Sequence, residues 1–177
     1  MHDPRLLDLL SSFAPFQRQS EVHRAIPKGL EPLAPSTAGG RWSPRGSVPV
    51  IYTSLTREGS LAEISYHWSL LDPLPSKPVD LYRLRASTHK TLRLEEKDLV
   101  ALGVDLAGIG KISYKLTQDI GAAVSFLGFD GLVVPSARWK TENLVIFAEN
   151  SLLDSAFDVV DSEEIEWQVW AKSNGFL

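Results

Sequence analysis

The stretch from residue 27 to residue 49 constrains the fold of this chain more than any other part of it. Proline and glycine recur through it, at Pro27, Gly29, Pro32, Pro35, Gly39, Gly40, Pro44, Gly46 and Pro49. Because proline lacks a backbone donor and glycine favours turns, no regular helix or strand can run through this stretch. Loops of this length inside a compact domain are usually functional, so we expect the loop to carry part of a site.

The rest of the chain mixes helix and strand signals. Apolar spacing and capping residues predict helices near residues 6–10, from the cap Thr56 to about 71, near 95–102 and over 116–127. Strands are predicted over 21–26, 48–54, 79–85, 132–135 and 143–147, with a final strand in which Ile165, Trp167 and Val169 alternate with polar residues. The strands at 132–135 and 143–147 are expected to form a hairpin or to lie adjacent.

These signals follow no strict strand–helix–strand rhythm, and the chain has 177 residues. We therefore expect residues 1–177 to form a single compact α+β domain with a mixed, mainly antiparallel sheet.

Composition excludes several classes of function. A formal net charge of −4 gives no whole-chain footprint for a polyanion, so we expect no direct binding of nucleic acid. Cysteine is missing and the histidines are scattered, so no metal site is expected. The start of the chain does not resemble a signal peptide, and no apolar run approaches the roughly 18 residues of a membrane span, so we expect a cytoplasmic protein. The glycines of Gly108-Ile109-Gly110 lack the third glycine of a dinucleotide fingerprint, because Ser113 stands in its place.

Two arginines stand where a purely structural sequence would place a neutral residue. Arg24 shares a strand face with Val22 and Ile26, so it either serves a site or extends to water from an edge strand. Arg41 and Trp42 follow two glycines in the loop, a combination suited to a bidentately held anion with a stacked ring. An incidental loop arginine is the alternative.

Glu63 is the most informative acidic residue. On the predicted helix it lies about 120° from the apolar stripe of Leu61, Ile64, Trp68 and Leu71. We expect Gly59, one turn earlier, to leave open space above the carboxylate; a plainly solvated glutamate is the alternative.

Further polar groups lie on or beside strands. Tyr52 is in a strand, where it is either a core residue with a satisfied hydroxyl or part of a site. Ser136 follows one strand and Asn143 opens the next. Arginines, aromatic rings and one carboxylate, without a metal or a general-base histidine, fit chemistry at the glycosidic carbon of a dinucleotide.

The order of these motifs resembles the RES-domain family, which is named for its Arg, Glu and Ser. The resemblance covers residues from about 22 to 147 and rests on Val22-His23-Arg24-Ala25-Ile26, Gly39-Gly40-Arg41-Trp42-Ser43-Pro44, Pro49-Val50-Ile51-Tyr52-Thr53-Ser54, Leu61-Ala62-Glu63, Gly128-Phe129-Asp130-Gly131-Leu132-Val133-Val134-Pro135-Ser136-Ala137-Arg138 and Asn143-Leu144-Val145.

The resemblance implies the toxin of a bacterial toxin–antitoxin pair, with a fold similar to ADP-ribosyltransferases. The implied activity is cleavage of the nicotinamide–ribose bond of NAD+, as a glycohydrolase or a phosphorylase. A mono-ADP-ribosyltransferase acting on a protein, or an inactive nucleotide- or partner-binding module, are the alternatives. The implied partner is a helix-turn-helix antitoxin of the Xre type.

The resemblance also assigns roles to individual residues. It implies that Glu63 is the catalytic carboxylate and that Arg24 and Arg41 anchor the phosphates and ribose. Tyr52 is implied to stack or orient, and Trp42 to contact substrate beside Arg41. Ser136 and Asn143 are implied to be polar groups lining the site.

Overall fold

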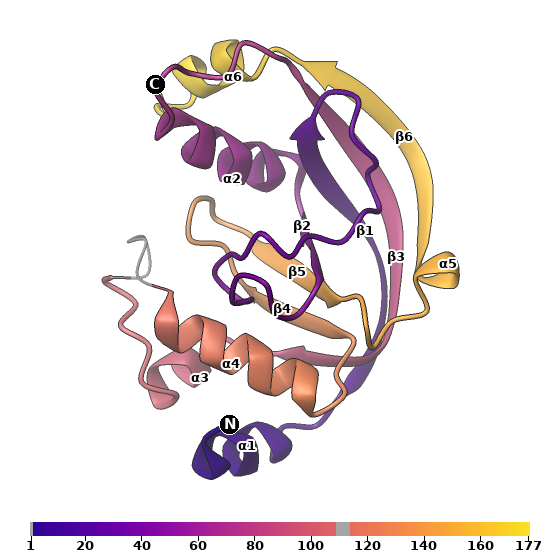
Figure 1. The fold of residues 1–177 in the computed structure, drawn as a ribbon, viewed down its shortest axis with the longest axis vertical. Helices are drawn as coiled ribbons and strands as arrows, with labels where there is room; N and C mark the ends of the chain where they lie inside the picture. The colour runs from indigo at the N-terminus through magenta and orange to yellow at the C-terminus, as the bar shows by residue number, and fades with distance from the viewer. Residues whose placement is uncertain (1, 109–113) are drawn as a thin grey trace.

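A strongly curved six-stranded sheet forms the centre of this computed structural model, which describes residues 2–108 and 114–177 (Figure 1). Its strands are β1 (Phe16–Pro27), β2 (Val50–Ser54), β3 (Val79–Arg93), β4 (Gly131–Pro135), β5 (Glu142–Phe147) and β6 (Phe157–Ile165). They lie in the order β1-β2-β5-β4-β3-β6, and β1 also pairs with β3. The sheet therefore closes on itself through β1, and β6 is added along the outer side of β3.

The pairing confirms a mixed, mainly antiparallel sheet. β3 and β4 run parallel, whereas the other described neighbours are antiparallel. β4 and β5 form the expected antiparallel pair, in which Val134 lies opposite Asn143. The turn between them therefore lies directly beside Asn143.

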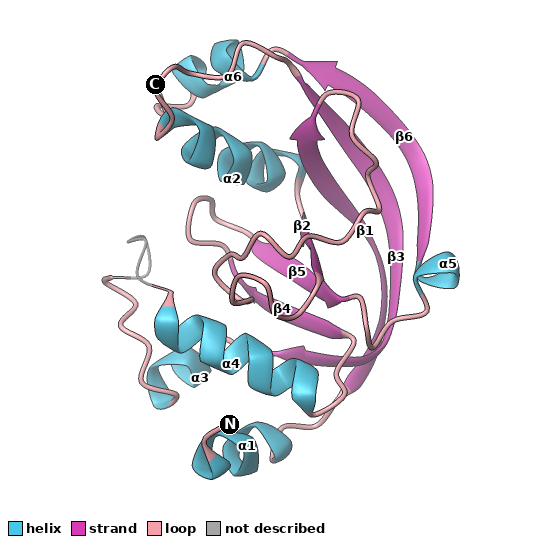
Figure 2. Cartoon of the chain, in the orientation of Figure 1, coloured by secondary structure: helices cyan, strands magenta, loops and turns pink. Residues whose placement is uncertain are grey.

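Most of the described helices lie at the two ends of the sheet, and α5 lies on its outer side beside β3 and β6 (Figure 2). They are α1 (Pro4–Ser11), α2 (Arg57–Ser69), α3 (Glu96–Ala101), α4 (Lys115–Phe126), α5 (Leu153–Ala156) and α6 (Trp167–Ser173). α2 packs beside α6, and α1 packs beside α4. None of the described helices has the length and apolar character needed to cross a bilayer.

Helix α2 begins where the sequence predicts. The Thr56 side chain accepts a hydrogen bond from the backbone N–H of Gly59 at 3.1 Å, which satisfies a donor that the helix cannot pair internally. Leu61 and Ala62 are buried, and Glu63 emerges beside them half-buried. The cap and the buried face together fix the rotation of α2 and the direction of Glu63.

Three predicted strands are wrong in extent or type. The strand expected over 21–26 runs from Phe16 to Pro27. The strand expected over 79–85 continues to Arg93, because β3 goes on pairing with β1 as far as Thr91. The expected final strand is replaced by the end of β6 and the start of α6. Trp167 and Ala171, four residues apart, are the buried residues of α6, whereas Val169 is 65% exposed. This spacing is helical rather than alternating.

Candidate active site

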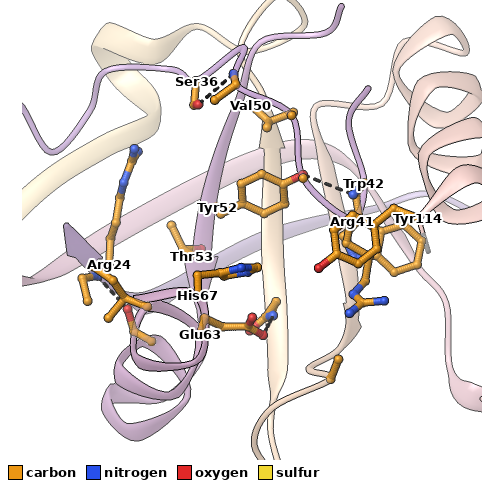
Figure 3. Close-up of a pocket in the computed structure, with 18 of the residues that line it drawn as sticks. Arg24, Ser36, Arg41, Trp42, Val50, Tyr52, Thr53, Glu63, His67 and Tyr114 are labelled. Atoms are coloured by element: carbon orange, nitrogen blue, oxygen red, sulfur yellow. Dashed lines mark hydrogen bonds between the residues drawn. The ribbon is translucent and has the colours of Figure 1, made fainter. Parts of the chain in front are cut away.

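A cavity of about 590 Å³ opens between the sheet, α2 and the proline- and glycine-rich loop (Figure 3). Its volume lies in the range of about 300–1,000 Å³ typical of small-molecule sites. The sequence-predicted residues that line it are Arg24, Arg41, Trp42, Tyr52, Glu63 and Asn143. The structure therefore brings Arg41 of the loop and Glu63 of α2 to one cavity.

Glu63 is held from behind by two side chains of the β4–β5 region. Its Oε1 accepts hydrogen bonds from the hydroxyl of Ser136 and from Nδ2 of Asn143, each at 2.8 Å. Because Oε1 takes both bonds, Oε2 is the oxygen left available to a ligand in the cavity. A fixed carboxylate with one free oxygen suits electrostatic stabilisation of a developing positive charge.

Ser136 supports this carboxylate from outside the lining of the cavity. Its Oγ accepts the backbone N–H groups of Arg138 at 3.1 Å and Trp139 at 3.3 Å. Because the same oxygen receives two donors, its own proton is committed to Glu63. Ser136 therefore fixes Glu63, and its hydroxyl is not poised as a nucleophile.

The expected open space beside Gly59 is not present. Gly59 is buried, and a Cβ at this position would lie 2.3 Å from Ser54 Oγ and 2.5 Å from Thr141 Cγ2. The glycine therefore permits the close approach of α2 to β2 and to the β4–β5 turn, and it leaves no room for ligand.

Arg41 forms a second wall of the cavity. Its guanidinium lies over the ring of Tyr114, with Cζ 4.6 Å from the ring centroid. Burial lowers the pKa of Arg41 from its usual value, although an arginine remains charged in this setting. No ion pair involves Arg41 among residues 2–108 and 114–177. Its charge is thus available to an anionic ligand.

Arg24 lies on the other side of Glu63 in the view of Figure 3. β1 pairs with β3 along its length and with β2 at His23, so Arg24 does not lie on an edge strand, and its half-buried side chain lines the cavity. Nη2 of Arg24 donates to the carbonyl of Ala34 at 3.1 Å, which ties the loop to β1. Nη1 is buried and has no partner in the part of the chain that the structure describes. Burial also lowers the pKa of Arg24.

Tyr52 and Trp42 set the conformation of the loop. The hydroxyl of Tyr52 accepts the backbone N–H of Trp42 at 3.1 Å, and burial raises the pKa of Tyr52, so it stays a neutral phenol. The exposed π-face expected of Trp42 is not there, because its side chain is 2% exposed and packs in the core. Trp42 also packs against α4, where a Cβ at Gly121 would lie 1.9 Å from its carbonyl oxygen.

The side chains that line the cavity and that sequence reasoning missed include Tyr114, Gln118 and His67. Tyr114 stacks on Arg41, and Gln118 donates from Nε2 to the carbonyl of Gly40 at 2.9 Å. His67 lies four residues after Glu63 on α2, so helical spacing could have identified it. It stays in contact with solvent, but the protein around it removes part of its hydration and lowers its pKa. Tyr114 and Gln118 carry no such signal, because only tertiary packing brings α4 to the loop.

The charge of the cavity is predominantly positive. Arg24, Arg41 and Arg45 line it, and Glu63 is the carboxylate among its described lining residues. Within residues 2–108 and 114–177, no three histidine, aspartate or glutamate side chains are grouped to hold a metal ion. The glycine motif beginning at Gly108 extends into residues 109–113, which lie outside the described residues.

Comparison with protein families gives a match to the RES domain over residues 18–168. This chain belongs to the RES domain family. The matched range includes every predicted site residue and extends beyond the motif-bearing range of about 22–147. The family predicted from the motif order is therefore confirmed.

The RES domain also has a close structural counterpart. The crystal structure of the M. tuberculosis MbcT–MbcA toxin–antitoxin complex contains a chain that superposes with a TM-score of 0.84 at 18% identity. The match covers 96% of this chain and 97% of that chain, so the two share one fold over nearly their whole length. Comparison with curated proteins gives no match.

Proposed function

We propose that this RES domain cleaves the nicotinamide–ribose bond of NAD+ and is the toxin of a bacterial toxin–antitoxin system. The observation that carries the proposal is the carboxylate of Glu63, held by Ser136 and Asn143 inside a cavity whose other charged lining residues are arginines. A dinucleotide offers the matching groups, namely two phosphates for the arginines and a ribose for the carboxylate.

Glu63 would act on charge that grows during the reaction. As the bond from ribose C1′ to nicotinamide lengthens, its electron pair leaves with the nicotinamide and positive charge develops on the ribose. Oε2 of Glu63 would stabilise that charge directly or through a ribose hydroxyl. Since the charge exists in the transition state and not in the ground state, this interaction accelerates the reaction rather than only strengthening binding.

Arg24 and Arg41 would hold the pyrophosphate. Their separation across the cavity, on either side of Glu63 in Figure 3, suits an extended ligand that passes the carboxylate. Tyr114 holds the Arg41 guanidinium by its ring face, and Tyr52 fixes the loop that carries Arg41. Both rings thereby preorganise a phosphate-binding arginine, which reduces the entropy lost on binding.

The acceptor of the ADP-ribosyl group would be water or phosphate. Attack of either at this ribose carbon releases nicotinamide and gives ADP-ribose or ADP-ribose phosphorylated at the same carbon. Ser136 is no acceptor, since its hydroxyl proton is directed to Glu63. The second candidate activity is mono-ADP-ribosylation of a protein, in which a protein side chain is the acceptor. The fold relationship to ADP-ribosyltransferases that we propose favours this candidate.

The structural counterpart is part of a toxin–antitoxin complex. By the same likeness we propose an antitoxin partner for this chain, a helix-turn-helix protein of the Xre type.

Product analysis tests the proposed reaction. The purified protein is incubated with NAD+, with and without inorganic phosphate, and the products are separated by chromatography. Release of nicotinamide with ADP-ribose or its phosphate supports the proposal, and intact NAD+ after binding to the protein contradicts it. Radiolabelled NAD+ in a cell lysate separates the second candidate, because a labelled protein band shows transfer. Growth arrest on expression, relieved by an Xre-type partner, tests the toxin assignment.

A further inference from the structure

Behind Glu63, the turn that joins β4 to β5 forms a second layer of the site. The turn spans residues 136–141 and is closed by two backbone bonds, from Ser136 N to Thr141 O at 2.9 Å and from Thr141 N to Trp139 O at 2.8 Å. The Ser136 side chain, which binds Glu63, receives the N–H groups of Arg138 and Trp139 from the same turn. The position of Glu63 therefore depends on the shape of this turn.

Arg138 attaches the turn to the helix that carries Glu63. Its guanidinium lies flat on Tyr66, with Cζ 3.3 Å from the ring centroid, and Tyr66 follows Glu63 by three residues on α2. On the other side, Trp139 packs on Trp170 of α6 with ring centroids 5.8 Å apart. The turn is thus held against both helices at this end of the sheet.

The half-buried side chain of Arg138 has two nitrogen atoms that are buried without a hydrogen bond among the described residues. Nε and Nη2 are buried and have no hydrogen-bond partner within the described ranges. Leaving such donors unpaired carries a desolvation cost, which the ring face of Tyr66 offsets only in part. A neutral side chain would avoid that cost, so the charge and planarity of Arg138 have a use beyond packing.

We propose that Arg138 is a positioning residue, whose stacking on Tyr66 fixes the turn so that the Ser136 hydroxyl meets Oε1 of Glu63. This inference rests on the proposed function, because its kinetic test measures NAD+ cleavage. Arg138 does not line the cavity, although its neighbour Ala137 does, so it acts through Ser136 and not by touching the dinucleotide. Burial is the main cause of the lowered pKa of Arg41 and of His67, and the nearby charge of Arg138 lowers both further, which places Arg138 beside the site.

Steady-state kinetics of NAD+ cleavage test this role in the full-length protein. Arg138→Met should lower kcat by about 10- to 100-fold with KM changed by less than about threefold, because a displacement of about 1 Å at the reacting groups costs on the order of 10²-fold. Arg138→Lys keeps the charge without the planar stack and should recover only part of the loss. Tyr66→Phe keeps the ring face and should stay active, whereas Tyr66→Leu should behave as Arg138→Met.

Double variants distinguish a linked clamp from independent effects. Adding Tyr66→Leu or Ser136→Ala to Arg138→Met should cause little further loss, because residues acting through one contact are not additive. Arg85→Met, which removes an exposed arginine of β3 that lies outside the cavity lining, is the matched control and should leave kcat unchanged. Additive losses, full activity of Arg138→Met, or a tenfold rise in KM at constant kcat would each overturn the proposal.

Hydrogen exchange gives a readout that does not depend on NAD+ cleavage. The amides of Arg138 and Trp139, which donate to Ser136, should exchange faster in Arg138→Met and Tyr66→Leu than in the wild type and in Arg85→Met. Unchanged exchange would overturn the clamp even if the enzyme is active. Faster exchange in a protein that leaves NAD+ intact would support the clamp while refuting the proposed reaction.

Discussion

Replacing Glu63 by glutamine removes its negative charge and leaves its shape. The amide oxygen can take the place of Oε1 and accept the bonds of Ser136 and Asn143, so the amide nitrogen takes the place of Oε2. Loss of a charge aimed at the developing positive charge should lower kcat by about 10²- to 10³-fold, by analogy with removal of one oxyanion-hole donor. Nicotinamide release, followed by chromatography, measures this loss.

The same two bonds set the expected change in stability. A hydrogen bond to a charged group contributes about 1.5–3 kcal/mol and a neutral one about 0.5–1.5 kcal/mol, so the two weakened bonds together cost about 2–3 kcal/mol. The lower desolvation cost of a half-buried amide offsets part of this. For a chain of 177 residues, the unfolding temperature should therefore fall by less than about 12 °C.

A matched variant separates the loss of charge in the cavity from the loss of charge on the helix. Glu58 lies on α2 in its first turn and outside the cavity lining, so Glu58→Gln should leave kcat unchanged. If Glu63→Gln unfolds near the wild-type temperature and cleaves NAD+ within about threefold of the wild-type rate, the catalytic role of Glu63 is refuted.

Three further perturbations follow from the same geometry. Gly121→Ala places a methyl group against the backbone of Trp42 and should destabilise the fold by at least about 3 kcal/mol in urea unfolding, whereas the neighbouring Ala122→Gly should cost about 1 kcal/mol; equal losses would contradict the packing. Tyr52→Phe leaves the Trp42 N–H without its acceptor and should cost about 1–3 kcal/mol in the same assay; unchanged stability would show that this bond is dispensable. Burial lowers the pKa of His23, so below about pH 6.5 the unfolded chain binds the proton first, and the free energy of unfolding should fall from pH 7.5 to pH 5.5; His23→Asn should reduce that fall, and an equal fall would exclude His23 as its source.

Much of the site could be predicted from sequence because its charged residues stand at positions where packing alone would favour a neutral residue. Arg24 lies between apolar neighbours on its strand face, and Glu63 lies off the apolar stripe of its helix. Both positions indicated a functional role, and both residues line one cavity. The burial of Trp42 could not be read in the same way. Its motif places it beside Arg41, but its surroundings come from α4 and the core.

The incorrect predictions of secondary structure also arise from contacts that the local sequence does not record. Alternation of apolar and polar residues over 165–169 fits a strand, yet so short a window cannot distinguish a strand from a helix that buries Trp167 and Ala171. The second half of β3 contains Ser87, Thr88 and His89, whose apolar pattern is weak. Pairing with β1 makes it a strand, and the local sequence does not carry that information.

A crystal structure of Glu63→Gln grown with NAD+ would locate the dinucleotide while the reaction is blocked. We expect the pyrophosphate to contact Arg24 and Arg41, with the nicotinamide riboside against residue 63. NAD+ bound with its pyrophosphate away from both arginines and its ribose away from residue 63, or a cavity left empty at saturating NAD+, would contradict the assignment of this cavity as the NAD+-cleaving site.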